Sequence, residues 1–451
     1  MDIQKINTLF KGKVIFPTDP DYDEARQVFY GDIDKKPEVI IKVADRDDVK
    51  QAVLLAKEQG LELAVRSGGH SVSGYSSSNG IVIDLRDMRK TEIDTTAKTV
   101  WVETGLTAGE LTRELDEYNM VLGFGDTGSV GIGGITLGAG IGYLVRKFGL
   151  AIDNLLAAEV VTASGEILQV DENNHSDLFW ALRGGGGNFG VVTRFKFKLH
   201  ELGDCYGGTL LLPATPKAIA DVAQFMDEAP DELSAIVNVM PTFPMPNVPE
   251  EFHGKLSMMI SMVYAGPPGE GEKVVAPLRA IAEPIADMLK PMRYKDMFPP
   301  EDLSHRPTAV SRNLFLNNID TKVAGEIIDQ LNNIGASIKA FQFRVLGGAV
   351  ARVSSDATAY AHRTSHIMCN IACFYESAAD KPEKQQWAKT FEEAVIQSDA
   401  AAYVNFLGPD EQDKLLSAYP PATLQKLQEV KAKYDPENLF RLNFNITPTT
   451  N

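Results

Sequence analysis

The stretch AVRSGGHSVSGYSSSNGIVIDL, residues 64–85, places a histidine on a glycine turn between two apolar segments. The flanking runs LELAV and IVIDL have the aliphatic, β-branched composition of strands. His70, at the tip of the turn, therefore has two interpretations. Either it simply ends a tight turn, which is the commoner role of a lone loop histidine, or the turn presents its imidazole to a ligand.

The chain has the composition of an ordinary globular protein. It contains 451 residues, of which 44% are hydrophobic and 23% charged, and this length is enough for two or three domains. It has no run of 18 apolar residues, and its first residues lack the basic end, apolar stretch and cleavage site of a signal peptide. We therefore expect a cytoplasmic protein with no membrane partner. The net charge of −17 also disfavours nucleic acid as a partner.

Three cysteines are too few for a disulfide framework. Cys369 and Cys373 lie in the strand-like run HIMCNIACFYE, where both side chains would point to the same face. Free cysteines usually pack as small hydrophobic residues, so a core position is the better interpretation of both. We expect no metal site in this chain.

The N-terminal half alternates strand and helix patterns. Residues 45–60, DRDDVKQAVLLAKEQG, predict a helix with Asp45 as its N-cap and Gly60 as its C-terminal stop. Residues 155–171 predict a hairpin, and Ser176 is the expected N-cap of a short helix that follows it. Such alternation, with a strand-rich segment behind it, predicts an α+β protein.

The composition of the sequence changes near residue 204. Glycine becomes rarer there, and proline-rich loops such as PTFPMPNVPEEF appear. We expect residues 1–203 and 408–451 to form one domain, to which the C-terminal tail returns, and residues 204–407 to form a second α+β domain.

Three glycine-rich clusters stand out in the first domain. They are RSGGHS (66–71), the long run that begins GFGDTGSVGIGG (123–154) and RGGGGNFGVV (183–192). Glycine lets a backbone approach a ligand closely, and successive N–H groups can then hold phosphate oxygens. GIGGITLG lacks the strand and acidic partner of a Rossmann fingerprint, and the Walker spacing is absent. The clusters predict a phosphate-bearing cofactor that is held by loops.

In their order and spacing, the clusters resemble the FAD domain of the p-cresol methylhydroxylase (PCMH) and vanillyl-alcohol oxidase superfamily. RSGGHSVSGY, GIGGITLGAGIGYLVRKFGLAIDN and DLFWALRGGGGNFGVVT are most similar to its berberine-bridge-enzyme-like branch, as are YVNF (403–406) and YDPENLFRLNFNI (434–446). The overall run is most similar to the bacterial members of that branch. The resemblance implies a two-subdomain FAD-binding domain of the PCMH type and an α+β substrate domain with an antiparallel sheet.

The resemblance also implies how FAD is attached. In this family the loop histidine, here His70, bonds to the 8α carbon of the flavin, and a neutral imidazole is a competent nucleophile for that role. Many members add a link from a cysteine in the pattern Cys-x-x-Val-Gly-x-Gly-Gly. Here that cysteine is replaced by Thr127, so we expect one covalent link, at His70, and no cysteinyl link.

Further contacts with FAD follow from the motif matches. The residues expected there, besides His70, are Arg66, Ser67, Gly68, Gly69, Ser71, Gly74, Thr127, Gly128, Val130, Gly131, Gly133, Gly134, Leu137, Gly138, Gly140, Gly142, Asn154, Val160, Gly190, Val192, Tyr403, Asn443 and Asn445. Some of the glycines are expected to serve loop geometry alone.

The expected catalytic residues are Tyr403, Tyr75 and Asn405. Family members commonly use a tyrosine as base, its pKa lowered by neighbours, and Tyr403 matches that residue. Packing with a satisfied hydroxyl is an equally weighted alternative for Tyr403. Asn405 would hold the flavin ring or the substrate, and Tyr75 would line the pocket.

The resemblance implies an oxidase that transfers a hydride from a small alcohol, amine or sugar to FAD and then passes the electrons to dioxygen, giving hydrogen peroxide. Two alternatives stay open: a dehydrogenase that uses another electron acceptor, and a flavin-binding protein with little turnover. A monomer or a homodimer is expected.

Overall fold

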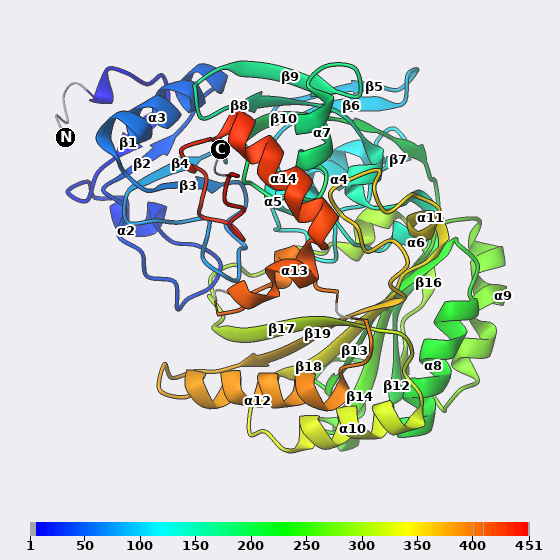
Figure 1. The fold of residues 1–451 in the computed structure, drawn as a ribbon. Helices are drawn as coiled ribbons and strands as arrows, with labels where there is room; N and C mark the ends of the chain where they lie inside the picture. The colour runs from blue at the N-terminus through cyan, green and yellow to red at the C-terminus, as the bar shows by residue number, and fades with distance from the viewer. Residues whose placement is uncertain (1–5, 400, 409, 450–451) are drawn as a thin grey trace.

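The computed structural model describes residues 6–399, 401–408 and 410–449. The described chain is built on two larger sheets, of five and eight strands, a four-stranded sheet and a two-stranded ribbon. Figure 1 shows the eight-stranded sheet below, with helices beneath it, and the remaining sheets above it. No helix in the described residues is long and apolar enough to cross a membrane. The mixed helix-and-sheet architecture with antiparallel sheets confirms the predicted α+β class.

The four-stranded sheet carries the loop that contains His70. Its strands, in order, are β1 (Lys13–Ile15), β2 (Val39–Lys42), β4 (Ile81–Asp84) and β3 (Leu63–Arg66). Strands β3 and β4 are parallel neighbours, so residues 67–80 must return the length of the sheet between them. This return gives the serine- and glycine-rich loop enough chain to leave the sheet and reach the segments beyond it.

Helix α3 (Arg46–Gln59) packs on this sheet and ends where the sequence predicts. The Asp45 side chain accepts hydrogen bonds from the N–H groups of Asp47 and Asp48, and Gly60 adopts a left-handed φ of +64°. Both predicted caps are therefore confirmed.

The five-stranded sheet is antiparallel throughout. Its strands, in order, are β5 (Thr91–Asp94), β6 (Thr99–Glu103), β10 (Val191–Lys198), β8 (Leu155–Val161) and β9 (Ile167–Asp171). The predicted hairpin is β8–β9. The expected N-cap at Ser176 is wrong by one residue, because His175, with a left-handed φ of +49°, precedes helix α7 (Ser176–Leu182).

Short elements connect these sheets. They are α2 (Tyr22–Ala25), α4 (Ala108–Asp116), α5 (Ile132–Gly138), α6 (Val145–Phe148), η1 (Ala151–Asn154) and the ribbon of β7 (Met120–Val121) with β11 (His200–Glu201).

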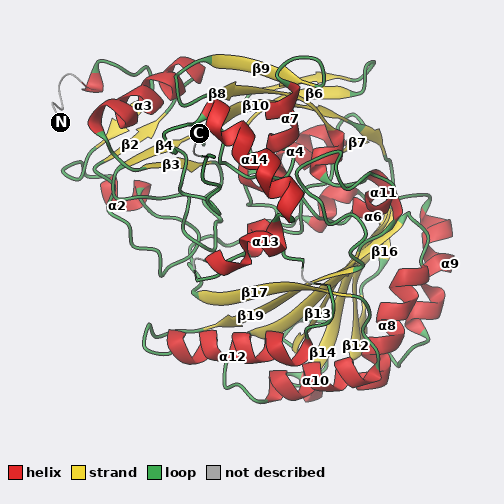
Figure 2. Cartoon of the chain, viewed as in Figure 1, coloured by secondary structure: helices red, strands yellow, loops and turns green. Residues whose placement is uncertain are grey.

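The eight-stranded sheet begins at residue 205 and is antiparallel. Its order is β15 (Ala286–Asp287), β12 (Cys205–Pro213), β14 (Leu256–Tyr264), β13 (Leu233–Pro241), β18 (Lys339–Val345), β19 (Ile367–Phe374) and β17 (Ala309–Leu316), with β16 (Lys290–Met292) beside β12. Helices α8 (Pro216–Glu228), α9 (Pro268–Arg279), α10 (Thr321–Asn332) and α12 (Lys381–Val395) cover one face (Figure 2). The small elements here are η2 (Glu250–Phe252), η3 (Tyr294–Met297) and α11 (Gly348–Ala351).

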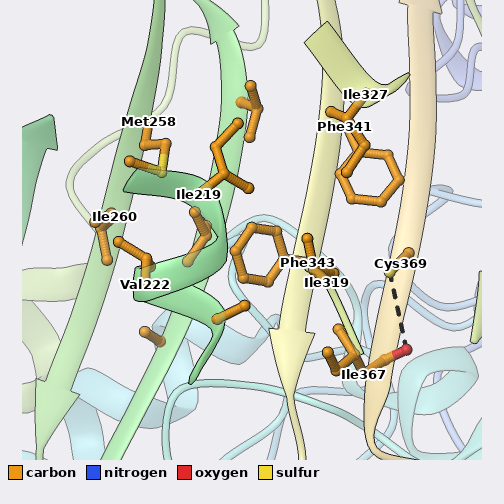
Figure 3. Close-up of a cluster of buried hydrophobic side chains, with 14 of the residues drawn as sticks. Ile219, Val222, Met258, Ile260, Ile319, Ile327, Phe341, Phe343, Ile367 and Cys369 are labelled. Carbon is orange, nitrogen blue, oxygen red and sulfur yellow. Dashed lines mark hydrogen bonds between the residues drawn. The ribbon is translucent and has the colours of Figure 1, made fainter. Parts of the chain in front are cut away.

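The covered face of this sheet forms a continuous apolar core (Figure 3). Phe341 and Phe343 of β18 point into it, and Ile219 and Val222 of α8 pack against the sheet. Cys369 and Cys373 belong to the same core, which confirms their predicted role. Because strand residues alternate between faces, the residues between these core positions point to the opposite face, toward the upper sheets.

The C-terminal segment returns to the upper sheets through η4 (Val404–Phe406), η5 (Gln412–Lys414), α13 (Leu415–Ala418) and α14 (Pro421–Tyr434).

A buried lysine fixes the position of this C-terminal segment. Lys431, fully buried, donates to the carboxylate of Asp435 at 2.6 Å and to the carbonyl oxygens of Asn188 and Phe440 at 2.7 and 3.0 Å. One ammonium group therefore joins α14, the third glycine cluster and the final segment.

We expect Lys431→Met to destabilise the protein by about 3–5 kcal/mol, because it leaves the buried carboxylate of Asp435 without a cation. Lys433→Met, two residues on, removes an exposed pair with Asp177 and should cost about 1 kcal/mol or less. Urea unfolding monitored by tryptophan fluorescence measures both. Equal midpoints for the two variants would contradict the assigned role of Lys431.

Candidate active site and cofactor cavity

One cavity, of about 370 Å³, collects the segments that the sequence singled out. Its wall contains residues of the loop 67–76, of the segment 125–137, of the third glycine cluster at 186–192 and of the C-terminal segment 440–444. Residues 403–407 also line it. Motifs that lie hundreds of residues apart in the chain therefore meet around one space, whose volume is typical of a ligand site.

The first two glycine clusters meet backbone against backbone. A Cβ atom built on Gly68 would lie 2.2 Å from the amide nitrogen of Gly131, and one built on Gly131 would lie 2.1 Å from that of Gly68. Ser67 links the loops further, since its hydroxyl accepts from the N–H of Gly133 at 3.1 Å and donates to the carbonyl of Thr104 at 2.7 Å. Only glycine permits this approach, so these two residues determine the shape of the cavity wall.

His70 lies on the cavity wall directly after this contact. Its ring stacks on Phe29, with centroids 4.1 Å apart. Burial lowers the pKa of His70 to about 4, although the carboxylate of Glu301 acts in the opposite direction. The imidazole is therefore neutral at physiological pH, with a ring nitrogen available for bonding to carbon.

Thr127 also lies on the wall, and its hydroxyl contacts the carboxylate of Asp126 at 3.3 Å. The residues that line the cavity, all within the described chain, include no cysteine. Cys205, Cys369 and Cys373 are buried in the cores around the eight-stranded sheet.

The wall suits a large cofactor with polar and apolar parts. The hydroxyl of Ser76 is buried on the wall without a hydrogen-bond partner, as expected where a polar ligand supplies one. Part of the wall is apolar and is formed by Val191, Phe440 and Leu442. The glycine loops expose backbone groups on other parts of the wall. This combination of apolar walls, close backbone and an unpaired hydroxyl fits FAD.

Tyr403 and Asn405 form a hydrogen-bonded pair on the cavity wall. The Tyr403 hydroxyl oxygen accepts from the Asn405 amide at 2.9 Å and from the N–H of Gly140 at 3.2 Å. Burial raises the pKa of Tyr403, whereas both donors lower it. This differs from the lowered pKa that the family resemblance implies, because desolvation outweighs the two hydrogen bonds.

Tyr75 lines the same cavity but has a different partner. Its hydroxyl accepts from the Gln412 side chain at 2.8 Å, and burial raises its pKa. The hydroxyl therefore lies between the His70 loop and the C-terminal segment.

The structure separates the residues expected at FAD into two groups. Those on the cavity wall are Ser67, Gly68, Gly69, His70, Ser71, Thr127, Val130, Gly131, Gly133, Gly134, Leu137, Gly190, Val192, Tyr403 and Asn443. Those outside the wall are Arg66, Gly74, Gly128, Gly138, Gly140, Gly142, Asn154, Val160 and Asn445.

Arg66 and Gly138, of the second group, contact residues of the wall. Arg66 is fully buried and donates to the carbonyl of Ser76 at 3.1 Å. Asn154 instead contacts residues outside the wall: its amide donates to the carbonyl oxygens of Phe148 and Leu150, and its oxygen contacts the ring of His200 at 2.6 Å. Gly138 leaves room for Asn405, since a Cβ atom there would lie 2.1 Å from its side-chain oxygen.

Two charged residues on the wall were not anticipated from the sequence. Arg344 of β18 donates to the carboxylate of Asp126 at 2.6 Å and to the carbonyl of Ile141 at 2.8 Å. Its side chain is 4% exposed. A signal was available: Arg344 is a charge in the apolar strand FQFRV, and Asp126 is the one acid in a long glycine-rich run before Asp153. Nothing in the sequence paired them.

Comparisons with known proteins agree with this geometry. Residues 37–171 match the profile of the FAD binding domain family, and residues 402–447 match that of the family described as berberine and berberine like. An FAD-linked oxidoreductase of Dictyostelium discoideum is 30% identical over 431 residues, covering 93% of this chain and 91% of that protein. (R)-6-hydroxynicotine oxidase of Paenarthrobacter nicotinovorans is 26% identical over 97% of both chains. The crystal structure of 6-hydroxy-D-nicotine oxidase from Arthrobacter nicotinovorans superposes with a TM-score of 0.85 at 27% identity, over 98% of each chain.

We expect Gly131→Ala to separate the two glycine loops, because its Cβ has no room beside Gly68. Overpacking of this kind costs about 1–3 kcal/mol, and FAD retention after gel filtration should fall with it. Gly134→Ala is the matched control for stability, since a Cβ there meets no atom within 4 Å. If both variants unfold at the same denaturant concentration, the close contact between the loops does not restrict which side chain residue 131 can carry, and the prediction is wrong.

Proposed function

Because the chain belongs to the family of FAD-linked oxidoreductases of the berberine-bridge-enzyme-like kind, we propose that it is an oxidase with covalently bound FAD. It acts on a small molecule, an alcohol, amine or sugar, and passes the electrons to dioxygen. When bound, FAD supplies the hydride acceptor of this reaction. The observation that carries the proposal is a neutral His70 on the wall of a cavity that all three glycine clusters line.

His70 would hold FAD through a single bond to the 8α carbon. A neutral imidazole has the free electron pair that this bond requires, and the stacked ring of Phe29 keeps it in one plane. Thr127 carries no thiol, so we propose no second link. The glycine loops on either side of His70 would hold the rest of the cofactor through their backbone.

Tyr403 would accept the proton of the substrate hydroxyl. As a phenolate, its oxygen accepts two hydrogen bonds from the protein and keeps a further lone pair, which would take the substrate proton. The same two donors favour the phenolate and so oppose the effect of burial. Asn405 then acts by orienting Tyr403, and Tyr75 lines the cavity on the His70 side.

The proposal also includes the electron acceptor. Dioxygen is the acceptor that we propose, with a dehydrogenase and a low-turnover flavin-binding protein as alternatives. A panel of alcohols, amines and sugars, added without air, separates the three. Bleaching of the flavin that reverses in air indicates an oxidase, bleaching that persists in air indicates a dehydrogenase, and no bleaching indicates a low-turnover flavin-binding protein.

We propose residues 1–203 with 408–451 as the flavin domain and residues 204–407 as the substrate domain.

Protein precipitated with acid should keep its yellow colour, because the bond to His70 survives denaturation. His70→Ala should release all of the flavin into the supernatant. His366→Ala changes an exposed histidine directly before β19, and this variant should keep the colour. A His70→Ala pellet that stays yellow would rule out this attachment.

Tyr403→Phe should lower kcat for flavin reduction by about 10²–10⁴ through loss of the general base, while the acid pellet remains yellow. Stopped-flow reduction under nitrogen measures this rate separately from the reaction with dioxygen. A variant that reduces its flavin at the wild-type rate would assign Tyr403 to packing alone.

A further inference from the structure

The ring of His70 is oriented by the ring of Phe29. The two rings stack with their centroids 4.1 Å apart and their planes 21° from parallel. Within the described residues, no hydrogen bond reaches the His70 ring. A stacked neighbour therefore sets the tilt of this imidazole, and with it the direction in which the ring presents a nitrogen to the cavity. That direction depends on where the protein holds Phe29.

The backbone on either side of Phe29 is held by an arginine from the other end of the fold. Arg306 lies in the connection 298–308, between η3 and β17. Its guanidinium donates to the carbonyl oxygen of Val28 at 2.8 Å and to that of Tyr30 at 3.1 Å. These carbonyls come directly before and after the stacking residue in the chain. One rigid, planar cation therefore fixes the backbone on both sides of that residue.

The same stretch of backbone has two further contacts with the edge of the eight-stranded sheet. The N–H of Gly31 donates to the carbonyl of Pro307, just before β17, at 2.9 Å. The carboxylate of Asp32 accepts from the hydroxyl of Tyr375, just after β19, at 2.6 Å and from the ammonium of Lys381 at 2.7 Å. The residues that follow α2 are thus attached to this sheet over several consecutive positions.

The opposite side of this stretch faces the His70 loop. The backbone N–H of Phe29 donates to the carbonyl of Gly69 at 3.1 Å, and the Phe29 side chain lines the cofactor cavity beside His70. Arg306 is not among the residues of the cavity wall. Its influence on the cavity passes through two contacts, from the guanidinium to the backbone around Phe29 and from the Phe29 ring to the imidazole.

We propose that Arg306 is a positioning residue for the covalent attachment of FAD. By fixing the backbone around Phe29, it holds the His70 ring in the orientation that a bond to the 8α carbon requires. The inference rests on the proposed function, because it concerns the single bond at His70. It makes attachment of the cofactor dependent on contact between the eight-stranded sheet and the stretch after α2.

Attachment is an oxidation, and dioxygen, the acceptor in the proposed function, is its oxidant. One N–H bond of the His70 ring and one C–H bond of the 8α methyl group break, and one N–C bond forms. The two protons and two electrons that are released reach dioxygen through FAD and leave as hydrogen peroxide. Arg306 takes part in none of these bond changes. It acts on the rate by keeping the reacting nitrogen aligned.

The rate of attachment measures this positioning directly. Full-length protein purified without flavin is mixed with FAD in air, and samples are precipitated with acid over time. Flavin in the acid pellet is covalently bound, whereas flavin that co-elutes with native protein in gel filtration gives the total. We expect Arg306→Met to bind as much FAD as the wild type and to attach it about 10–100-fold more slowly, as a misplaced reacting group does.

Further variants separate positioning from a general loss of structure. Arg306→Lys keeps a cation that can donate to the same carbonyls and should recover most of the rate. Arg352→Met removes an exposed arginine that pairs with Asp231 and should attach FAD at the wild-type rate. Phe29→Leu removes the stacked ring and should slow attachment as much as Arg306→Met does. The double variant should be no slower than Phe29→Leu, because both changes interrupt the same pair of contacts.

Attachment at the wild-type rate in Arg306→Met, or additive losses in the double variant, would overturn the proposal. So would a parallel fall in total and covalent flavin, since Arg306 would then serve binding and not orientation. If Arg306→Met does not fold, Phe29→Leu decides, and a wild-type rate in that variant has the same meaning. A colourless acid pellet from the wild-type protein contradicts the proposed function instead, so the two failures are distinguishable.

Discussion

The contact between Gly68 and Gly131 is the constraint on which the rest of the site depends. Two backbones approach so closely that neither residue can carry a side chain. The contact places His70 on the wall of a cavity that the segment 125–137 also lines. Because a loop between parallel strands would otherwise be free to move, its position must come from a neighbouring loop. The price of this arrangement is conformational entropy, since glycine loses the most freedom on folding.

Three buried cationic side chains also hold distant segments of the chain together. Arg66, Arg344 and Lys431 are each at most 4% exposed, and each donates to backbone carbonyl groups as well as facing a carboxylate. A cation that only donates imposes direction on its partners, so each one orients groups from distant segments. Lys431 joins the final segment to the third glycine cluster. Arg344 joins the eight-stranded sheet to the segment before Thr127.

Local patterns predicted much of this molecule. The caps of α3, the β8–β9 hairpin and the core cysteines follow from spacing over fewer than twenty residues, and the structure agrees with each. The cap of α7 was misplaced because a left-handed histidine is not visible in composition. The pairing of Asp126 with Arg344 could not be predicted, since 218 residues separate them.

The sequence by itself determined the cofactor class, because glycine spacing and the histidine loop are local features that chemistry constrains directly. It also determined the α+β class and the absence of a thiol at residue 127. Only the tertiary structure decided which side chains line the cavity and how they are oriented. Tyr403 receives its two donors, and Arg344 its carboxylate partner, from residues that sheet register and chain return bring together. Register is a property of pairs of strands, and no single stretch of chain contains it.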